Sequence, residues 1–138
     1  MSLAGHADVS PDGKEIWVAN AQDGTISIIN YPEKKVVQTL TVDVRGANRL
    51  KFTPDGKSVL VSSGPELVVL DASTRKVVKR ISIGHGSGGV LVQPDGARAF
   101  VSCGPDNYVA VIDLRTLKVA GHISAGSGPD GLAWAVRR

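Results

Sequence analysis

Three of the four Pro-Asp-Gly triplets in the chain recur at a near-constant interval, and this repeat constrains the fold more than any other feature of the chain. The triplets begin at Pro11, Pro54 and Pro94, so the intervals are 43 and 40 residues. In a turn, Pro presets φ, Asp hydrogen-bonds its own backbone and Gly takes a positive φ at no steric cost. Self-similarity at such a period is typical of repeat architectures. The chain is therefore predicted to be an array of copies of one supersecondary unit.

Each triplet lies between short runs rich in Val, Ile and Thr that are bounded by Gly, Pro, Asn and Asp, which indicates strands and hairpins. In the first unit we expect strands near residues 6–10, 15–20, 25–30 and 36–42. No stretch has apolar residues at helical spacing over ten or more positions, so no helix is predicted. Four antiparallel strands in a unit of this length are the blade of a β-propeller.

The units together predict an all-β fold, a partial β-propeller of three four-stranded antiparallel blades in a single segment, 1–138. The sequence after the third unit repeats the start of a unit once more, which predicts an extra inner strand. The expected boundaries are about 6–42 for the first blade, 49–83 for the second, 89–124 for the third and 131–135 for the extra strand.

Three blades do not close a ring, because single-ring propellers typically have four to eight. An open array exposes apolar blade faces and strand edges. Two interpretations follow. Either the chain is the C-terminal part of a longer parent propeller that supplies the missing blades, or two copies associate as a homodimer that completes a six-bladed ring. The strand at 131–135 would close the ring in the first case and exchange into the partner copy in the second.

A recognisable repeat consensus occurs in the first unit, at residues 16–20 and 25–30. It is clearest in the third unit, at Tyr108–Asp113 (Tyr-Val-Ala-Val-Ile-Asp). They resemble the YVTN repeats of bacterial and archaeal propellers. The resemblance covers nearly the whole chain, although the connection Gly64–Glu66 is shorter than the family pattern. It implies a propeller and an extracytoplasmic or cell-surface setting, such as a surface layer. It leaves the activity open, since that fold class also hosts lactonases and haem- or quinone-dependent enzymes.

The net charge of +3 arises from basic residues that recur at two turns of every unit, on what we expect to be one face. They are Lys14, Lys34, Lys35, Lys57, Arg75, Lys76, Arg98, Arg115 and Lys118. Such a ring attracts phosphates, so weak nucleic-acid binding is one alternative function. Acidic residues lie among these cations and no aromatic platform for bases accompanies them. We favour the interpretation that they are solvated and protect strand edges.

The residues that most often carry catalysis or bind metals occupy non-equivalent places in the repeat. His6, His85, His122 and Cys103 have no metal-ligand spacing, and Cys-x-x-Cys and Cys-x-x-Cys-His motifs are absent. We therefore predict no zinc or haem c site, no other cofactor and no catalytic residue. The glycine-rich run Gly84–Gly89 is interpreted as a turn between blades, because no helix follows it to bind a phosphate. The chain also has no apolar run of 18 residues and no signal peptide, so no membrane insertion is expected.

In propellers, the loops between units and the connections between second and third strands gather around the central channel. This geometry selects Arg45, Asn48, His85 and Asp130 as candidate binding residues on the channel rim. They suit a polar partner but do not form a mechanism. We therefore interpret the chain as a non-enzymatic binding or scaffold module for a protein or surface polymer. The alternative is a fragment of a propeller enzyme, either a lactonase or a haem- or quinone-dependent oxidoreductase.

Overall fold

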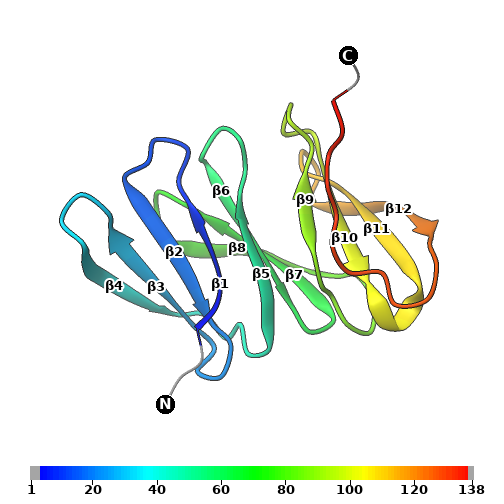
Figure 1. The fold of residues 1–138 in the computed structure, drawn as a ribbon, viewed down its shortest axis with the longest axis horizontal. Coiled ribbons are helices and arrows are strands. Elements are labelled where there is room, and N and C mark those ends of the chain that lie inside the picture. Colours follow the sequence, from blue (N-terminus) through cyan, green and yellow to red (C-terminus); the bar gives the residue numbers. More distant parts are fainter. Residues whose placement is uncertain (1–3, 137–138) are drawn as a thin grey trace.

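The computed structural model describes residues 4–136 as three four-stranded antiparallel sheets that lie side by side (Figure 1). Each sheet is one sequence unit with its strands in chain order, and we call the sheets blades 1 to 3. Blade 1 contains β1 (Ala4–Val9), β2 (Glu15–Asn20), β3 (Thr25–Asn30) and β4 (Lys35–Thr41). Blade 2 contains β5 (Ala47–Phe52), β6 (Ser58–Ser63), β7 (Glu66–Asp71) and β8 (Lys76–Ser82). Blade 3 contains β9 (Val90–Val92), β10 (Arg98–Cys103), β11 (Tyr108–Asp113) and β12 (Lys118–Ser124). The predicted all-β class is confirmed, and the helical part of residues 4–136 is one short 3-10 turn, Gly104–Asp106.

The Pro-Asp-Gly triplets that begin at Pro11, Pro54 and Pro94 form the same turn between the first two strands of each blade. Each of their glycines has a φ between +72° and +76°, a region that disfavours any residue with a Cβ. In each of these three triplets the aspartate Oδ1 accepts a hydrogen bond of 2.9 Å from the amide two residues further on. The turn is therefore determined locally by its own side chain, which explains why it marks the repeat so clearly in the sequence.

Main-chain hydrogen bonds between turns place the loops on two opposite ends of the blades. At one end, the turn after the third strand bonds to the Pro-Asp-Gly turn, through Tyr31 to Lys14, Ala72 to Lys57 and Leu114 to Ala97. At the other end, the loop that leaves each blade bonds to the connection between its second and third strands, through Val44 to Gly24, Ile83 to Pro65 and Ala125 to Asn107. The basic turns and the channel-rim loops thus lie on separate ends, as expected.

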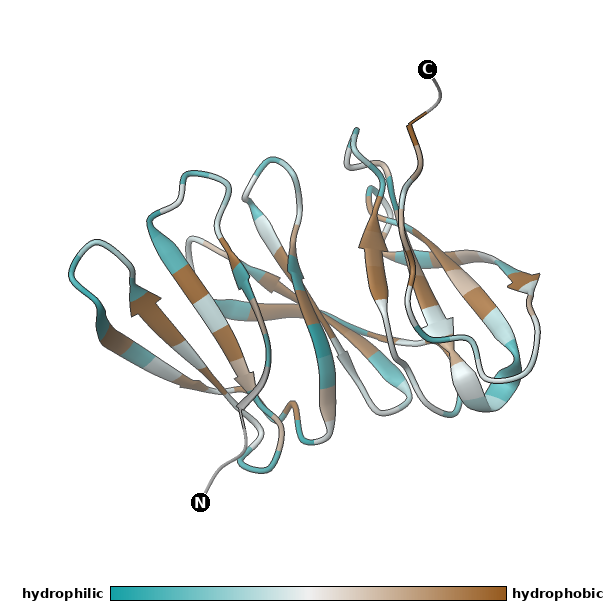
Figure 2. Ribbon diagram, in the orientation of Figure 1, coloured by the Kyte–Doolittle hydropathy of each residue, from teal (hydrophilic) through white to brown (hydrophobic). Residues whose placement is uncertain are grey.

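Two apolar cores fill the spaces between neighbouring blades. Trp17 of blade 1 is fully buried and meets Phe52 of blade 2 edge-on, with ring centroids 5.6 Å apart. Leu60 and Leu67 of blade 2 belong to the second core, against Val101 of blade 3. Apolar residues alternate along the strands while the turns are polar (Figure 2). Alternation is typical of strands with one covered face, whereas β6 and β7 of the middle blade are covered on both faces and are buried almost continuously.

Blade 1 carries an apolar cross-strand row on the face that turns away from blade 2. The register pairs Val9 with Ile16, Ile16 with Ile29 and Ile29 with Val36, so the four side chains share one face. We call them the free row. Val9 is 47% and Val36 60% exposed. The equivalent row of blade 2, Phe52, Val59, Leu70 and Val77, packs into the core against blade 1.

Residues 131–135, where an extra inner strand was expected, have no strand hydrogen bonding. They extend along the outer face of blade 3, where the Trp134 ring lies 6.2 Å from that of Phe100 (Figure 1). In each blade the first strand forms its ladder with the second strand of the same unit, and residues 4–136 contain no such second strand for 131–135. The segment therefore holds the expected place without forming a sheet.

Candidate binding site at the central channel

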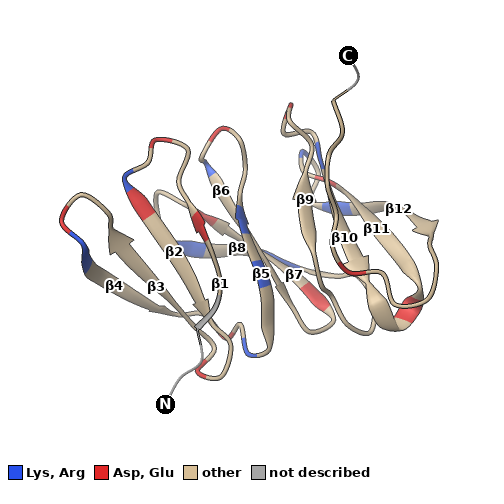
Figure 3. Cartoon of the chain, in the orientation of Figure 1, with Lys and Arg blue, Asp and Glu red and all other residues tan. Residues whose placement is uncertain are grey.

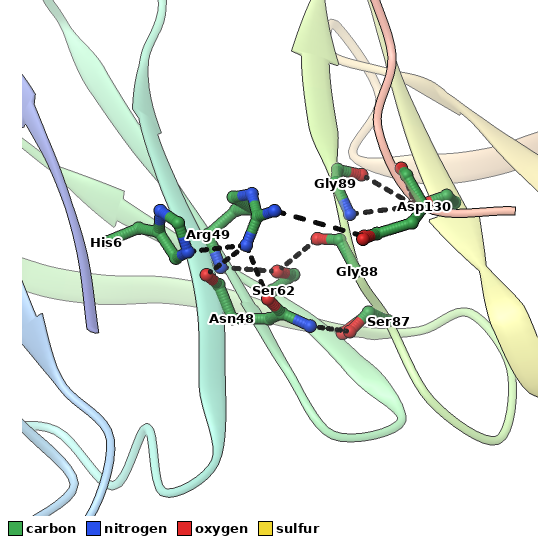
Figure 4. Close-up of polar contacts among 9 residues, drawn as sticks. His6, Asn48, Arg49, Ser62, Ser87, Gly88, Gly89 and Asp130 are labelled. Atoms are coloured by element: carbon green, nitrogen blue, oxygen red, sulfur yellow. Dashed lines mark hydrogen bonds and ion pairs between the residues drawn. The ribbon is translucent and has the colours of Figure 1, made fainter.

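Ser62, near the end of β6, joins its own inner strand to that of the next blade. Its Oγ accepts a hydrogen bond from the Arg49 amide at 3.0 Å and donates to the Gly88 carbonyl at 2.7 Å. The side chain is fully buried, so both bonds are shielded from water. This single hydroxyl sets the spacing of β5 and the strand that begins at Val90 (Figure 4).

Ser102 occupies the position of Ser62 in the next blade and makes the same two bonds. Its Oγ accepts from the Gly89 amide at 2.8 Å and donates to the Asp130 carbonyl at 2.5 Å. Asp130 therefore corresponds to Gly88: each main-chain oxygen accepts the hydroxyl hydrogen of the serine in the preceding blade. The start of the C-terminal segment, residues 130–136, is held in the register of a fourth inner strand.

The inner strands and this segment surround a cavity of about 270 Å³. Its wall carries three basic side chains, His6, Arg49 and Lys51, and no carboxylate. The remaining lining residues are small or apolar: Ala7, Leu50, Gly89, Val90, Gly131 and Leu132. A cationic site with apolar walls favours an anion that also has an apolar part.

Arg49 is the best-positioned cation of this cavity, and its side chain is 31% exposed. Its Nη1 donates to the Asn48 Oδ1 at 2.6 Å and to the Asn48 carbonyl at 3.1 Å, and it lies 2.6 Å from the Nε2 of His6. Its Nη2 is 4.0 Å from the Oδ1 of Asp130. Figure 4 marks this contact with a dashed line. One nitrogen is therefore clamped while the other is only loosely paired.

His6 accepts the Arg49 hydrogen bond as a neutral ring, because guanidinium nitrogens only donate. Burial lowers the pKa of His6, the adjacent Arg49 lowers it further, and Asp130 opposes them. The neutral form is thus favoured at pH 7. His6, Asn48 and the inner strand together orient Arg49 without cancelling its charge.

Of the four candidate residues selected from the sequence, Asn48 and Asp130 lie next to Arg49, whereas Arg45 and His85 lie apart from it. Asn48 clamps the guanidinium and Asp130 faces it, and both line a second hollow of about 350 Å³ beside the channel. Arg45 is 77% exposed and lies 3.9 Å from Asp43. His85 is 85% exposed at the channel end of blade 3.

His85 belongs to a separate arrangement with Asp106. The His85 amide donates to the Asp106 Oδ2 at 2.8 Å, and the His85 Nδ1 lies 2.5 Å from the Oδ1. These two bonds hold the pKa of Asp106 below its usual range. A Cβ on Gly84 would overlap the Asp106 carboxylate, so the glycine-rich loop serves close packing, as interpreted from the sequence.

The other groups considered for chemistry are spread over blade 3. Cys103 is fully buried, and burial raises the pKa of its thiol. His122 stacks on Tyr108 with ring centroids 4.2 Å apart. Among residues 4–136, no three His, Cys, Asp or Glu side chains are grouped closely enough to hold a metal ion. In the same part of the chain, no helix is long and apolar enough to cross a membrane.

The basic turns carry both signs of charge, as Figure 3 shows. Arg75 crosses to blade 1, where it pairs with Glu15 at 2.5 Å and donates to the side chain of Gln38. Arg115 lies 3.8 Å from Asp113. At least these two cations of the ring are engaged within the protein, which weakens the field that it presents to a polyanion.

Sequence reasoning missed Arg49 and His6, although a signal was present. His6, Arg49 and Gly89 each stand five residues before the proline of a Pro-Asp-Gly triplet. Equal offsets in a repeat place residues at equivalent positions around the channel. Comparing those positions across units would have revealed the basic pair.

Comparison with solved structures shows the fold. The chain superposes on Kuenenia stuttgartiensis hydrazine synthase with a TM-score of 0.87 and 25% identity, covering 93% of this chain and 38% of that one. It superposes on the WD40 repeats of RRP9 with a TM-score of 0.85 and 11% identity, covering 93% of this chain and 40% of that one. The chain thus spans about two fifths of each of these propellers.

The amino-acid sequence shows no match to the known proteins with which it was compared. No family model and no curated protein matches it. The propeller-type fold is therefore established, whereas membership of the YVTN family stays a prediction.

Proposed function

We propose that the chain is a non-enzymatic scaffold module whose exposed blade faces bind further blades, and that a second copy supplies them. The free row of blade 1 is the observation that carries this proposal. Its equivalents in blades 2 and 3 are covered by the preceding blade, so the surface is built to be covered by a blade of the same kind.

A two-fold homodimer would set blade 3 of one copy against blade 1 of the other and complete six blades, within the closed range of propellers. Burying apolar area is worth roughly 25 cal/mol per Å². In this arrangement β1 of the partner competes with residues 130–136 for the face of blade 3. The segment then crosses to the partner, and Trp134 leaves its place over Phe100.

The test replaces one residue of the free row and one matched residue outside it. Val36→Lys puts a charge into the contact, whereas Val78→Lys changes an equally exposed valine (56%) on the outer strand of blade 2. Sedimentation of the two variants should give a monomer for Val36→Lys and a dimer for Val78→Lys. Equal association states for both variants would contradict the proposal.

An extracytoplasmic or cell-surface setting fits such a scaffold, and it is supported only by the resemblance to YVTN repeats. The enzymatic and nucleic-acid alternatives have less in their favour. Against an enzyme, the side chain of His85, which pairs with Asp106, is exposed to solvent. Against nucleic-acid binding, cations of the basic turns form ion pairs within the protein, such as Arg75 with Glu15.

A further inference from the structure

The channel cavity around Arg49 has features that assembly does not require. Its lining residues all come from one chain, and they join two permanent cations to an apolar wall. Assembly through the free row uses the far face of blade 1 and leaves His6, Arg49 and Lys51 in place, whereas Gly131 and Leu132 line the cavity only while the C-terminal segment stays on blade 3 of its own chain. The cavity therefore calls for its own interpretation.

The guanidinium of Arg49 has an unused edge. The hydrogen bonds that it makes to residues 4–136 all start from Nη1. Nη2 approaches the nearest carboxylate oxygen, on Asp130, only to 4.0 Å, beyond hydrogen-bond distance. The Nε and Nη2 hydrogens form the parallel fork that binds a carboxylate through both of its oxygens.

The size and charge of the cavity narrow the class of ligand. A volume of about 270 Å³ is at the small end for ligand sites and suits a small organic molecule. Ala7 and Leu132 offer the apolar contact, since the side chains of Leu50 and Val90 are buried in the cores between the blades, and Lys51 adds a second positive charge. Asp130 lies beside the fork, and its charge opposes a doubly charged phosphate more than a singly charged carboxylate.

We propose that this cavity binds the carboxylate of a small organic acid through the Nε and Nη2 hydrogens of Arg49, with the apolar part of the acid against Ala7 and Leu132. His6 and Asn48 are positioning residues, because they hold Nη1 and so aim the opposite edge into the cavity. Lys51 attracts the anion.

The test uses benzoate as the probe and benzamide as its neutral counterpart of the same shape. Calorimetric titration of the full chain at low salt should show one benzoate per chain and binding of benzamide at least about tenfold weaker, the loss expected for a charge-assisted bidentate contact. Arg49→Gln should weaken benzoate binding by about tenfold or more. The control Arg45→Gln removes the same charge from the rim outside the cavity and should change it by less than about twofold.

Several results would overturn the proposal: equal affinity for benzoate and benzamide, no binding of benzoate, or benzoate binding unchanged in Arg49→Gln. Binding of inorganic phosphate in place of benzoate would overturn the carboxylate assignment. Lys51→Gln is a second variant at an exposed side chain, and it should weaken benzoate binding even if Arg49→Gln does not fold. The oligomeric mass of the same samples measures assembly separately from benzoate binding. Homodimer formation and carboxylate binding can therefore be accepted or rejected independently.

Discussion

Ser102 donates its hydroxyl hydrogen to the main-chain oxygen of Asp130 at 2.5 Å. Ser62 makes the same bond to Gly88 one blade earlier. A single side chain, repeated at one position, thus joins each inner strand to the next. It also holds the C-terminal segment on blade 3, beside the channel cavity.

Ser102→Ala should destabilise the protein and release the C-terminal segment. The Gly89 amide and the Asp130 carbonyl lose their partner in a buried setting, which costs about 1–3 kcal/mol. Urea unfolding measures the loss, and hydrogen exchange should speed up at residues 130–136. The exposed Ser82→Ala, in β8, is the control and should lie within about 0.5 kcal/mol of the wild type. Unchanged exchange in Ser102→Ala would contradict the anchoring role.

Gly89→Ala tests the same contact from the opposite side. A Cβ at this position would overlap the main-chain oxygen of Asp130 and lie 3.3 Å from its carbonyl carbon. Overpacking against backbone costs about 1–3 kcal/mol, so thermal unfolding should occur at a lower temperature. At Gly126 an added Cβ meets nothing within 4 Å, and Gly126→Ala should leave stability unchanged or slightly raised. Equal stability of the two variants would show that the segment does not pack as described.

The Pro-Asp-Gly turns should make stability depend on pH in the acid range. The Lys57 amide and the Thr53 hydroxyl donate to Asp55 and lower the pKa of its carboxyl below the ordinary value of 3.8. The stabilisation is therefore complete above that value and disappears as the pH falls through the lower pKa of the folded protein. Asp55→Asn should be less stable than the wild type at pH 7, and the difference should narrow towards pH 2. A difference that stays constant over this range, measured by urea unfolding, would contradict the role of the carboxylate.

The fold was predictable from the sequence because its turns are determined locally. Asp12, Asp55 and Asp95 accept hydrogen bonds from amides two residues further on, so each turn is determined by residues that are adjacent in the sequence. Asp71 and Asp113, the last residues of β7 and β11, act in the same way on the amides of Ser73 and Arg115. Short-range chemistry of this kind repeats with the chain and can be recognised without a structure.

The channel site was harder to predict, because it depends on contacts between blades. His6 and Arg49 are 43 residues apart in the sequence, and their contact follows from the register of two inner strands. Asp130 was selected from the sequence, but its main-chain oxygen is what Ser102 holds. The segment at 131–135 has the composition of a strand, yet strand formation requires a neighbouring edge that composition cannot supply.

The association state of the whole chain tests the central claim most directly. The free row of blade 1 is exposed, whereas the equivalent rows of blades 2 and 3 are covered by the preceding blade, so we expect the chain to exist as a homodimer. Light scattering at micromolar concentration should report twice the mass of the chain. Trp134→Asp should weaken this dimer if the C-terminal segment crosses to the partner, and a fully dimeric Trp134→Asp would contradict only that exchange. A monodisperse monomer of the wild-type chain would contradict assembly through the free row.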